Sequence, residues 1–289
     1  MDLLGELGKR VVCGDGALGT LLLSGGVPVE RCLEELCLSA PERIQKIHEE
    51  YVGAGATVIE TNSLGANAVR LGRVGLEKEV REINRAAVEL ARAGVGEHEG
   101  YVAGSVGPVG IAAAEADAAG IDRQGCFREQ ISALVDAGAD LVFLETFTEF
   151  AEMELALRAK QEVTDVPVIC SFACPADGKL RCGTPLKEAF ARLRDGGGTL
   201  MGVNCLNDPQ QMISLLESLQ ADYFLAVYPA AGQPRHTATG FAYDVTPESF
   251  AASVAGLAAN GARLIGGCCG TTPAHVAALA RAVRNCPAA

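Results

Sequence analysis

The stretch that decides the fold reads Leu-Ile-Gly-Gly-Cys-Cys-Gly-Thr-Thr-Pro and runs from Leu264 to Pro273. Its first residues are apolar and fit a short buried strand, and two adjacent cysteines bracketed by glycines follow. Thr272 and Pro273 then provide an N-cap residue and a proline at the first helical position. The pair Cys268–Cys269 is therefore expected where a strand ends and a helix begins, the edge at which parallel α/β proteins place their chemistry.

A third cysteine, Cys205, has the same setting, because it follows the apolar run 200–203 and precedes a helix start at Asp208-Pro209. Three cysteines at two strand ends can form a thiolate-rich metal site with one position left open. The adjacent pair could instead be inert core residues or a vicinal disulfide. A closed structural zinc site would need a fourth protein ligand, for which the candidates are Cys13, Cys174, Cys182 and His236.

Apolar strand-like runs alternate with helical patterns eight times along the chain. The expected strands are 10–13, 57–62, 101–105, 141–145, 168–172, 200–204, 224–228 and the run beginning at 264. They are continuous apolar runs, which indicates a parallel sheet buried on both faces. Repeated Gly-Ala joints before three of the strands give roughly 34 residues per unit, a βα size. We therefore predict an α/β protein, a (β/α)8 TIM barrel forming a single domain over residues 1–289, with a doubly wound sheet as the alternative.

Composition narrows the class of protein. The chain has 289 residues, a formal net charge of −12 and no basic run, which argues against binding to nucleic acid or an anionic membrane. Its 11 cysteines are odd in number and irregularly spaced, unlike a secreted disulfide framework. No signal peptide or membrane-length apolar run is visible, so a cytoplasmic location is expected. The helical or loop positions of His48, His98 and His275 predict surface residues.

Polar residues follow almost every expected strand and would converge on the C-terminal mouth of a barrel. Asp15 and Glu145 are expected to bind the ammonium group of an amino acid. Two carboxylates at a barrel mouth without a catalytic histidine between them suit cation binding better than acid–base catalysis. Ser105 and Thr146 are weaker candidates for the same pocket. The alternatives are a turn-stabilising role for Asp15 and an interior salt bridge for Glu145. Backbone amides of a glycine-rich turn could hold the substrate carboxylate, and this turn comprises Gly16, Ala17 and Leu18.

Six motifs together resemble the homocysteine S-methyltransferase family over nearly the whole chain. They are Gly14–Thr20 (GDGALGT), Glu60–Asn67 (ETNSLGAN), Gly104–Pro108 (GSVGP), Leu144–Thr146 (LET), Gly202–Cys205 (GVNC) and Gly266–Gly270 (GGCCG). The chain is most similar to the homocysteine-binding module of cobalamin-dependent methionine synthase and of bifunctional homocysteine methyltransferase/folate reductases. The cysteine motifs are specific, whereas the glycine motifs alone would be weak.

This resemblance implies a (β/α)8 barrel that carries one Zn²⁺ on Cys205, Cys268 and Cys269, and no catalytic residue beyond that site. It implies methyl transfer to the thiol of homocysteine, giving methionine, with Asp15 and Glu145 on the substrate ammonium. The chemistry of the residues agrees, because a zinc ion on three thiolates keeps an incoming thiol deprotonated and electron-rich. The methyl donor is expected from outside this chain, as methylcobalamin or a sulfonium compound, with a corrinoid- or folate-binding domain as a possible partner.

Two other functions fit the same residues. The acceptor could be another small thiol or a selenol such as selenocysteine, or the protein could be a non-catalytic zinc or thiol-redox barrel. One departure from the family pattern is Ala230 in Tyr228-Pro229-Ala230, where relatives commonly carry asparagine. Any role of that amide is lost or passes to another residue, for which Gln233 is the candidate.

Overall fold

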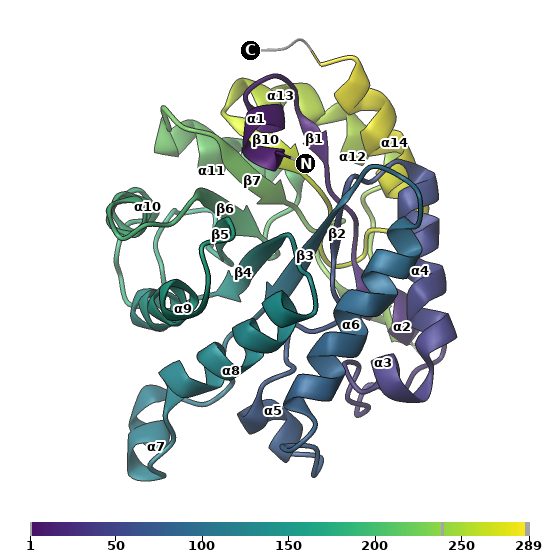
Figure 1. Ribbon diagram of the computed structural model, residues 1–289. Helices are drawn as coiled ribbons and strands as arrows, with labels where there is room; N and C mark the ends of the chain where they lie inside the picture. Colours follow the sequence, from purple (N-terminus) through teal and green to yellow (C-terminus); the bar gives the residue numbers. More distant parts are fainter. Residues whose placement is uncertain (1, 238–239, 287–289) are drawn as a thin grey trace.

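Eight parallel strands form the centre of the molecule in the computed structural model, which describes residues 2–237 and 240–286 (Figure 1). The strands are β1 (Val12–Cys13), β2 (Val58–Glu60), β3 (Tyr101–Val106), β4 (Leu141–Phe147), β5 (Val168–Phe172), β6 (Leu200–Asn204), β7 (Leu225–Tyr228) and β10 (Ala262–Ile265). Their hydrogen-bonded order is β1-β10-β7-β6-β5-β4-β3-β2. A parallel bridge between Gly14 and Val58 joins β1 to β2 and closes the barrel. The predicted (β/α)8 architecture is confirmed.

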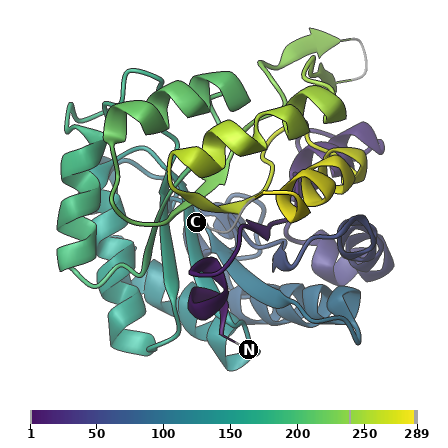
Figure 2. The same ribbon diagram turned by 90° about the horizontal axis from the view of Figure 1, so that it is seen from above.

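The helices surround this barrel, as the view from above shows (Figure 2). They are α1 (Leu3–Leu7), α2 (Leu18–Ser24), α3 (Leu36–Ser39), α4 (Pro41–Ala54), α5 (Ala68–Gly72), α6 (Val80–Val95), α7 (Ala113–Ala118), α8 (Arg123–Asp136), α9 (Phe150–Val163), α10 (Leu186–Asp195), α11 (Pro209–Leu219), α12 (Pro247–Ala252), α13 (Val254–Ala259) and α14 (Pro273–Arg284). None of the helices in the described residues is both long and apolar enough to cross a membrane.

Sequence signals at the helix ends explain where several of the helices begin. Asp208 caps α11 by accepting hydrogen bonds from the backbone N–H groups of Gln210 and Gln211, ahead of a proline at the first turn. Thr272 and His275 form a similar reciprocal cap at the start of α14. These starts hold the loops after β6 and β10, which carry the three cysteines, at fixed positions on the barrel edge.

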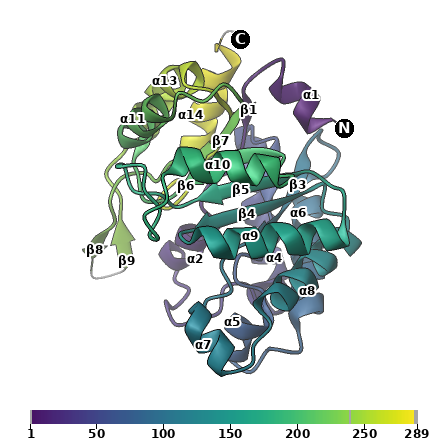
Figure 3. The same cartoon turned by 90° about the vertical axis from the view of Figure 1, so that its left-hand side faces the viewer.

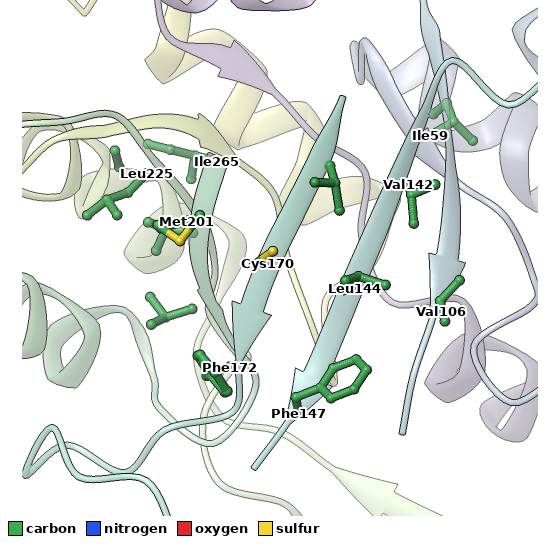
Figure 4. Close-up of a cluster of buried hydrophobic side chains, with 14 of the residues drawn as sticks. Ile59, Val106, Val142, Leu144, Phe147, Cys170, Phe172, Met201, Leu225 and Ile265 are labelled. Carbon is green, nitrogen blue, oxygen red and sulfur yellow. The ribbon is translucent and has the colours of Figure 1, made fainter. Parts of the chain in front are cut away.

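Strand alternation creates two separate apolar cores. On β4, Val142 and Leu144 point outward to the helices, whereas Phe143 points into the barrel. Figure 4 shows part of the outer core, in which Phe147 and Phe172 lie at the ends of adjacent strands. Burial of this kind contributes about 25 cal/mol per Å² of apolar surface and supplies most of the driving force for folding. The barrel interior is therefore a packed core rather than a channel.

Helix α1 closes the end of the barrel opposite the polar strand ends. Its Leu3 and Leu7 belong to the interior core, and the Tyr101 hydroxyl donates a 2.8 Å hydrogen bond to Glu6. This plug leaves the other mouth, formed by the carboxyl ends of the strands, as the open end.

One feature of the mouth was not expected from the sequence. The loop after β7 contains a two-stranded antiparallel hairpin, β8 (Arg235–Thr237) and β9 (Gly240–Ala242). Figure 3 shows this hairpin projecting from the barrel beside α2, and β9 packs against α2. Tyr243, the residue directly after β9, lies next to Cys269 and Gly270.

The expectation of surface histidines was wrong for two of the three. His98 is exposed, but His48 is completely buried between α4 and α6, and His275 is buried as part of the cap of α14. Gly94 on α6 makes room for His48, because a Cβ at that position would lie 2.4 Å from the His48 Cβ. Tertiary packing between two helices thus places a polar ring in the core.

Candidate active site

The carboxyl ends of the strands surround a pocket of about 350 Å³. The lining residues come from the ends of seven of the eight barrel strands and from the turns that follow them, far apart in sequence. Those that the sequence predicted are Asp15, Gly16, Ala17, Leu18, Ser105, Glu145, Thr146, Cys205, Cys268 and Cys269. The fold therefore brings every predicted site residue to one pocket.

Three cysteine sulfurs lie together at one side of this pocket, and we call Cys205, Cys268 and Cys269 the cysteine cluster. Their Sγ atoms all lie within 4.8 Å of one another. The Cys205–Cys269 separation is 3.7 Å and the Cys268–Cys269 separation is 4.0 Å, so these sulfurs are thiols rather than a disulfide. Within residues 2–237 and 240–286, this is the one group of three or more such side chains spaced to hold a metal ion.

Three of the other candidates for a fourth ligand, Cys13, Cys174 and Cys182, do not join the cluster. Cys13 and Cys174 are buried, and Cys182 is exposed on a separate loop. The backbone of His236 lies in β8, and its side chain is outside the described part of the chain. Among the described side chains, the cysteine cluster thus offers three thiols to a metal ion and faces the pocket on its open side.

The backbone around Cys205 is held in an unusual conformation. Cys205 and Leu206 have φ values of 58° and 38°, a left-handed region that non-glycine residues rarely adopt. The Cys205 N–H donates to the Tyr228 carbonyl at 3.0 Å, and the Gln233 side-chain amide donates to the Leu206 carbonyl at 2.9 Å. The end of β7 therefore fixes Cys205, and Gln233 in the loop after β7 fixes the neighbouring Leu206.

The adjacent pair Cys268–Cys269 is fixed by the loop after β7 and by the residue at the end of the β1 region, Asp15. The Cys268 N–H donates to the Pro229 carbonyl, and the Gly267 N–H donates to the Asp15 carbonyl, both at 2.8 Å. Gly266 has to be glycine, because a Cβ there would lie 2.2 Å from a ring carbon of Tyr228. Close approach of the strands thus sets the position of the cluster.

Neighbouring thiols and a tyrosine control the charge of the cluster. Hydrogen bonds from Cys205 and Cys268 lower the pKa of Cys269 to about 3, and the Tyr243 hydroxyl contributes in the same direction. Tyr243 follows β9, and its ring lies directly over Gly270, where a Cβ would be 2.2 Å from the ring. Of the three thiols, Cys269 therefore loses its proton most readily, and the Tyr243 ring lies beside it.

Three carboxyl groups lie next to the cysteine cluster in the same pocket. Burial is the main cause that raises the pKa of Asp15, Glu60 and Glu145, and their mutual repulsion raises the pKa of Asp15 and Glu60 further. The Asp15 carboxylate accepts a 2.8 Å hydrogen bond from the Glu60 backbone N–H. Among the described residues that line the pocket there is no lysine or arginine, so a cationic ligand would fit it best.

Glu145 is oriented by side chains from neighbouring strands. It accepts a 2.5 Å hydrogen bond from the Ser105 hydroxyl, and longer ones from Thr146 and Asn204. Asn204 also accepts from the Thr146 backbone N–H at 3.0 Å and from the Ser171 hydroxyl at 2.7 Å. Ser105 and Thr146 therefore act on the pocket through Glu145.

The glycine-rich turn after β1 forms another part of the pocket wall. Tyr51 donates a 2.7 Å hydrogen bond to the Ala17 carbonyl, and the Ala17 N–H donates to the Thr271 hydroxyl at 3.0 Å. The Ala17 amide is thus already engaged, which leaves the neighbouring amides of Gly16 and Leu18 as the stronger candidates for an anionic group.

Comparison with known proteins matches this arrangement to one family. The family model for homocysteine S-methyltransferase matches residues 12–283. The chain belongs to the homocysteine S-methyltransferase family. The metallated form of the homocysteine methyltransferase MmuM from Escherichia coli is 30% identical, with a TM-score of 0.80, and the match covers 96% of this chain and 98% of that one. The apo form of the same enzyme matches with a TM-score of 0.75 and 30% identity, covering 97% of this chain and 98% of that one.

Longer relatives in this family include methionine synthases. Those of Mycobacterium leprae and Mycobacterium tuberculosis are 32% and 31% identical over 99% and 98% of this chain. The chain spans about a quarter of their length. A methyltransferase from Methanosarcina mazei, 13% identical with a TM-score of 0.62, shares the fold.

Some contributors to the site could not be assigned from the family motifs. Glu60 stands in the second motif, but its direction into the pocket depends on the register of β2. Tyr243 and Gln233 lie in the loop after β7 that carries the hairpin, where no periodic pattern gives their position. Asn204 precedes Cys205 and is buried with 1% of its surface exposed, and strand alternation was the available signal for its inward direction.

Proposed function

We propose that this chain transfers a methyl group to the thiol of homocysteine with the help of one zinc ion, giving methionine. The observation that carries this proposal is the cysteine cluster beside a pocket lined by carboxyl groups. A thiol ligand with an ammonium group matches both halves of such a pocket. Membership of the homocysteine S-methyltransferase family supports the same acceptor.

The donor set of the cluster fits zinc. With Zn–S bonds of about 2.3 Å, sulfurs at the corners of a tetrahedron lie about 3.8 Å apart. The separations of 3.7 and 4.0 Å are close to this value, and thiolates are ligands that zinc prefers. Cys205, Cys268 and Cys269 would hold the ion, which when bound would favour the thiolate form of a substrate thiol at neutral pH.

The pocket residues would position homocysteine for this chemistry. Asp15 and Glu145 face its ammonium group, and Ser105 and Thr146 keep the Glu145 carboxylate directed at it. The substrate carboxylate would face the backbone of the turn that includes Gly16 and Leu18. Orientation of this kind lowers the barrier by holding the sulfur in line with the incoming methyl group.

The electrostatics of the pocket favour donors with positive charge. Carboxyl groups and cysteine thiolates accumulate negative charge at the mouth, which attracts a sulfonium or a similar cationic methyl compound. We propose that the donor is external to this barrel and is either such a compound or methylcobalamin, the latter carried by a corrinoid- or folate-binding partner domain, and that the reaction takes place in the cytoplasm. The length of the methionine synthases above supports a partner domain.

A donor screen tests the proposal. Zinc-loaded protein is incubated with homocysteine and, in separate reactions, methylcobalamin, S-methylmethionine, S-adenosylmethionine or betaine, and methionine is quantified. We expect zinc-dependent methionine formation with methylcobalamin or a sulfonium donor. Absence of methionine with every donor, or equal yield after removal of zinc by a chelator, would contradict the proposed function.

A further inference from the structure

Two carboxylate oxygens in the pocket have no hydrogen-bond partner among the described residues. They are Asp15 Oδ1 and Glu60 Oε1, and both are shielded from the surface. Asp15 as a whole is 97% buried, with 3% of its surface exposed. A buried acceptor without a partner destabilises the folded protein, and more so when it is charged, so these two oxygens point to a ligand that supplies hydrogen-bond donors.

The surroundings of Glu60 indicate what kind of ligand this is. Its carboxyl group lies against the Glu145 carboxyl group and the Tyr228 hydroxyl, and its backbone N–H is bonded to Asp15 Oδ2. Lysine and arginine are absent from the described lining of the pocket. A cationic group on a ligand would supply the partner that these oxygens lack.

Glu145 differs from the other two carboxylates because its oxygens already have partners. Ser105, Thr146 and Asn204 donate to it. An ammonium group has three N–H donors and no acceptor. Two of these donors would meet the unpartnered oxygens of Asp15 and Glu60, and the third would meet Glu145.

We propose that Glu60 completes the site for the substrate ammonium as a third acidic side chain, and that it restricts the acceptor to thiols with a free primary amine. This inference rests on the proposed function, since it concerns the same pocket and the same substrate. Glu60 is in this account a binding residue for the amine and has no direct part at the sulfur. Thiol acids without the amine would gain nothing from Glu60.

Binding measurements on zinc-loaded protein separate the amine from the thiol. The ligands are homocysteine and 4-mercaptobutanoate, which has the same thiol, chain and carboxylate but lacks the amine. In Glu60→Gln we expect the Kd for homocysteine to rise at least 10-fold, since a charge-assisted hydrogen bond is lost. The Kd for 4-mercaptobutanoate should stay within 3-fold. Glu60→Asp, which withdraws the carboxylate by one methylene, should show the same selective loss.

The matched control is Glu152→Gln, because Glu152 is also a buried glutamate but bonds the Val109 N–H outside the pocket. Its affinities for both ligands should be unchanged. Equal loss of both ligands in Glu60→Gln, or no loss of homocysteine in both folded Glu60 variants, would overturn the role of Glu60 alone. Failure of the unmodified zinc-loaded protein to bind either thiol would instead overturn the proposed function, and this inference with it.

Discussion

Asn204 offers the most stringent test of how the mouth is built, because one buried amide connects three strands. It accepts from the Thr146 N–H at 3.0 Å and the Ser171 hydroxyl at 2.7 Å, and it donates to the Thr146 hydroxyl at 2.7 Å. Thr146 itself has a φ of 62°, so its backbone depends on these contacts. Asn204→Ala removes all of them and leaves the Thr146 N–H unpaired.

The expected cost follows from these contacts. Two side-chain hydrogen bonds at about 1 kcal/mol each and one unsatisfied buried N–H at about 1–3 kcal/mol give a loss of about 3–5 kcal/mol. For a chain of this size the loss lowers Tm by about 10 °C. Because Glu145 also loses an orienting partner, homocysteine affinity should fall about 10-fold while the zinc content stays near one per chain.

Thermal unfolding and calorimetric titration with homocysteine measure both effects. The control is Asn260→Ala, since Asn260 donates a single 2.9 Å hydrogen bond to Gly256 at the end of α13. That variant should lose about 1 kcal/mol and keep its affinity. An Asn204→Ala protein within 1 kcal/mol of the parent, with unchanged affinity, would refute the assignment of Asn204 as the residue that orients this side of the pocket.

Three further predictions concern the metal site and the core. Replacing any one member of the cysteine cluster with serine should remove most of the zinc, measured by metal analysis, while circular dichroism stays unchanged; full occupancy would exclude that cysteine as a ligand. Tyr243→Phe removes the hydroxyl beside Cys269 and should weaken zinc about 10-fold in a chelator competition, an effect that unchanged affinity would disprove. Burial lowers the pKa of His48 to about 4 from 6.5, so the unfolded chain takes up a proton before the folded one, and stability falls as the pH drops from 6.5 to 4. The free energy of unfolding of His48→Leu, measured with denaturant, should therefore rise by about 3 kcal/mol relative to that of the parent as the pH is lowered from 7 to 4. A difference that does not change with pH would show that His48 has a normal pKa.

Much of the barrel could be predicted because a parallel strand buried on both faces requires a continuous run of apolar residues. Continuous apolar runs marked all eight strands, and the Thr-Pro and Asp-Pro pairs marked helix starts after β6, β7 and β10. The polar residues after those runs were expected at one mouth, and the structure places them around one pocket.

The remaining features depend on tertiary contacts that no local pattern encodes. The hairpin of β8 and β9 lies in the loop after β7, β9 packs against α2, and Tyr243 follows β9 directly. His48 was expected on the surface because a histidine in a helix usually lies on the solvent-exposed face. Its burial depends instead on the space that Gly94 leaves on the neighbouring helix. The free acceptor oxygen of Glu60 is visible only once the partners of every neighbouring carboxylate are known.

The central claim is that the cysteine cluster holds zinc and that the substrate thiol joins it. X-ray absorption at the zinc edge of the zinc-loaded protein, with and without homocysteine, measures this directly. We expect three sulfur neighbours and one lighter neighbour without homocysteine, and four sulfur neighbours at about 2.3 Å with it. A zinc environment that keeps the same number of sulfur neighbours when saturating homocysteine is added would contradict the account.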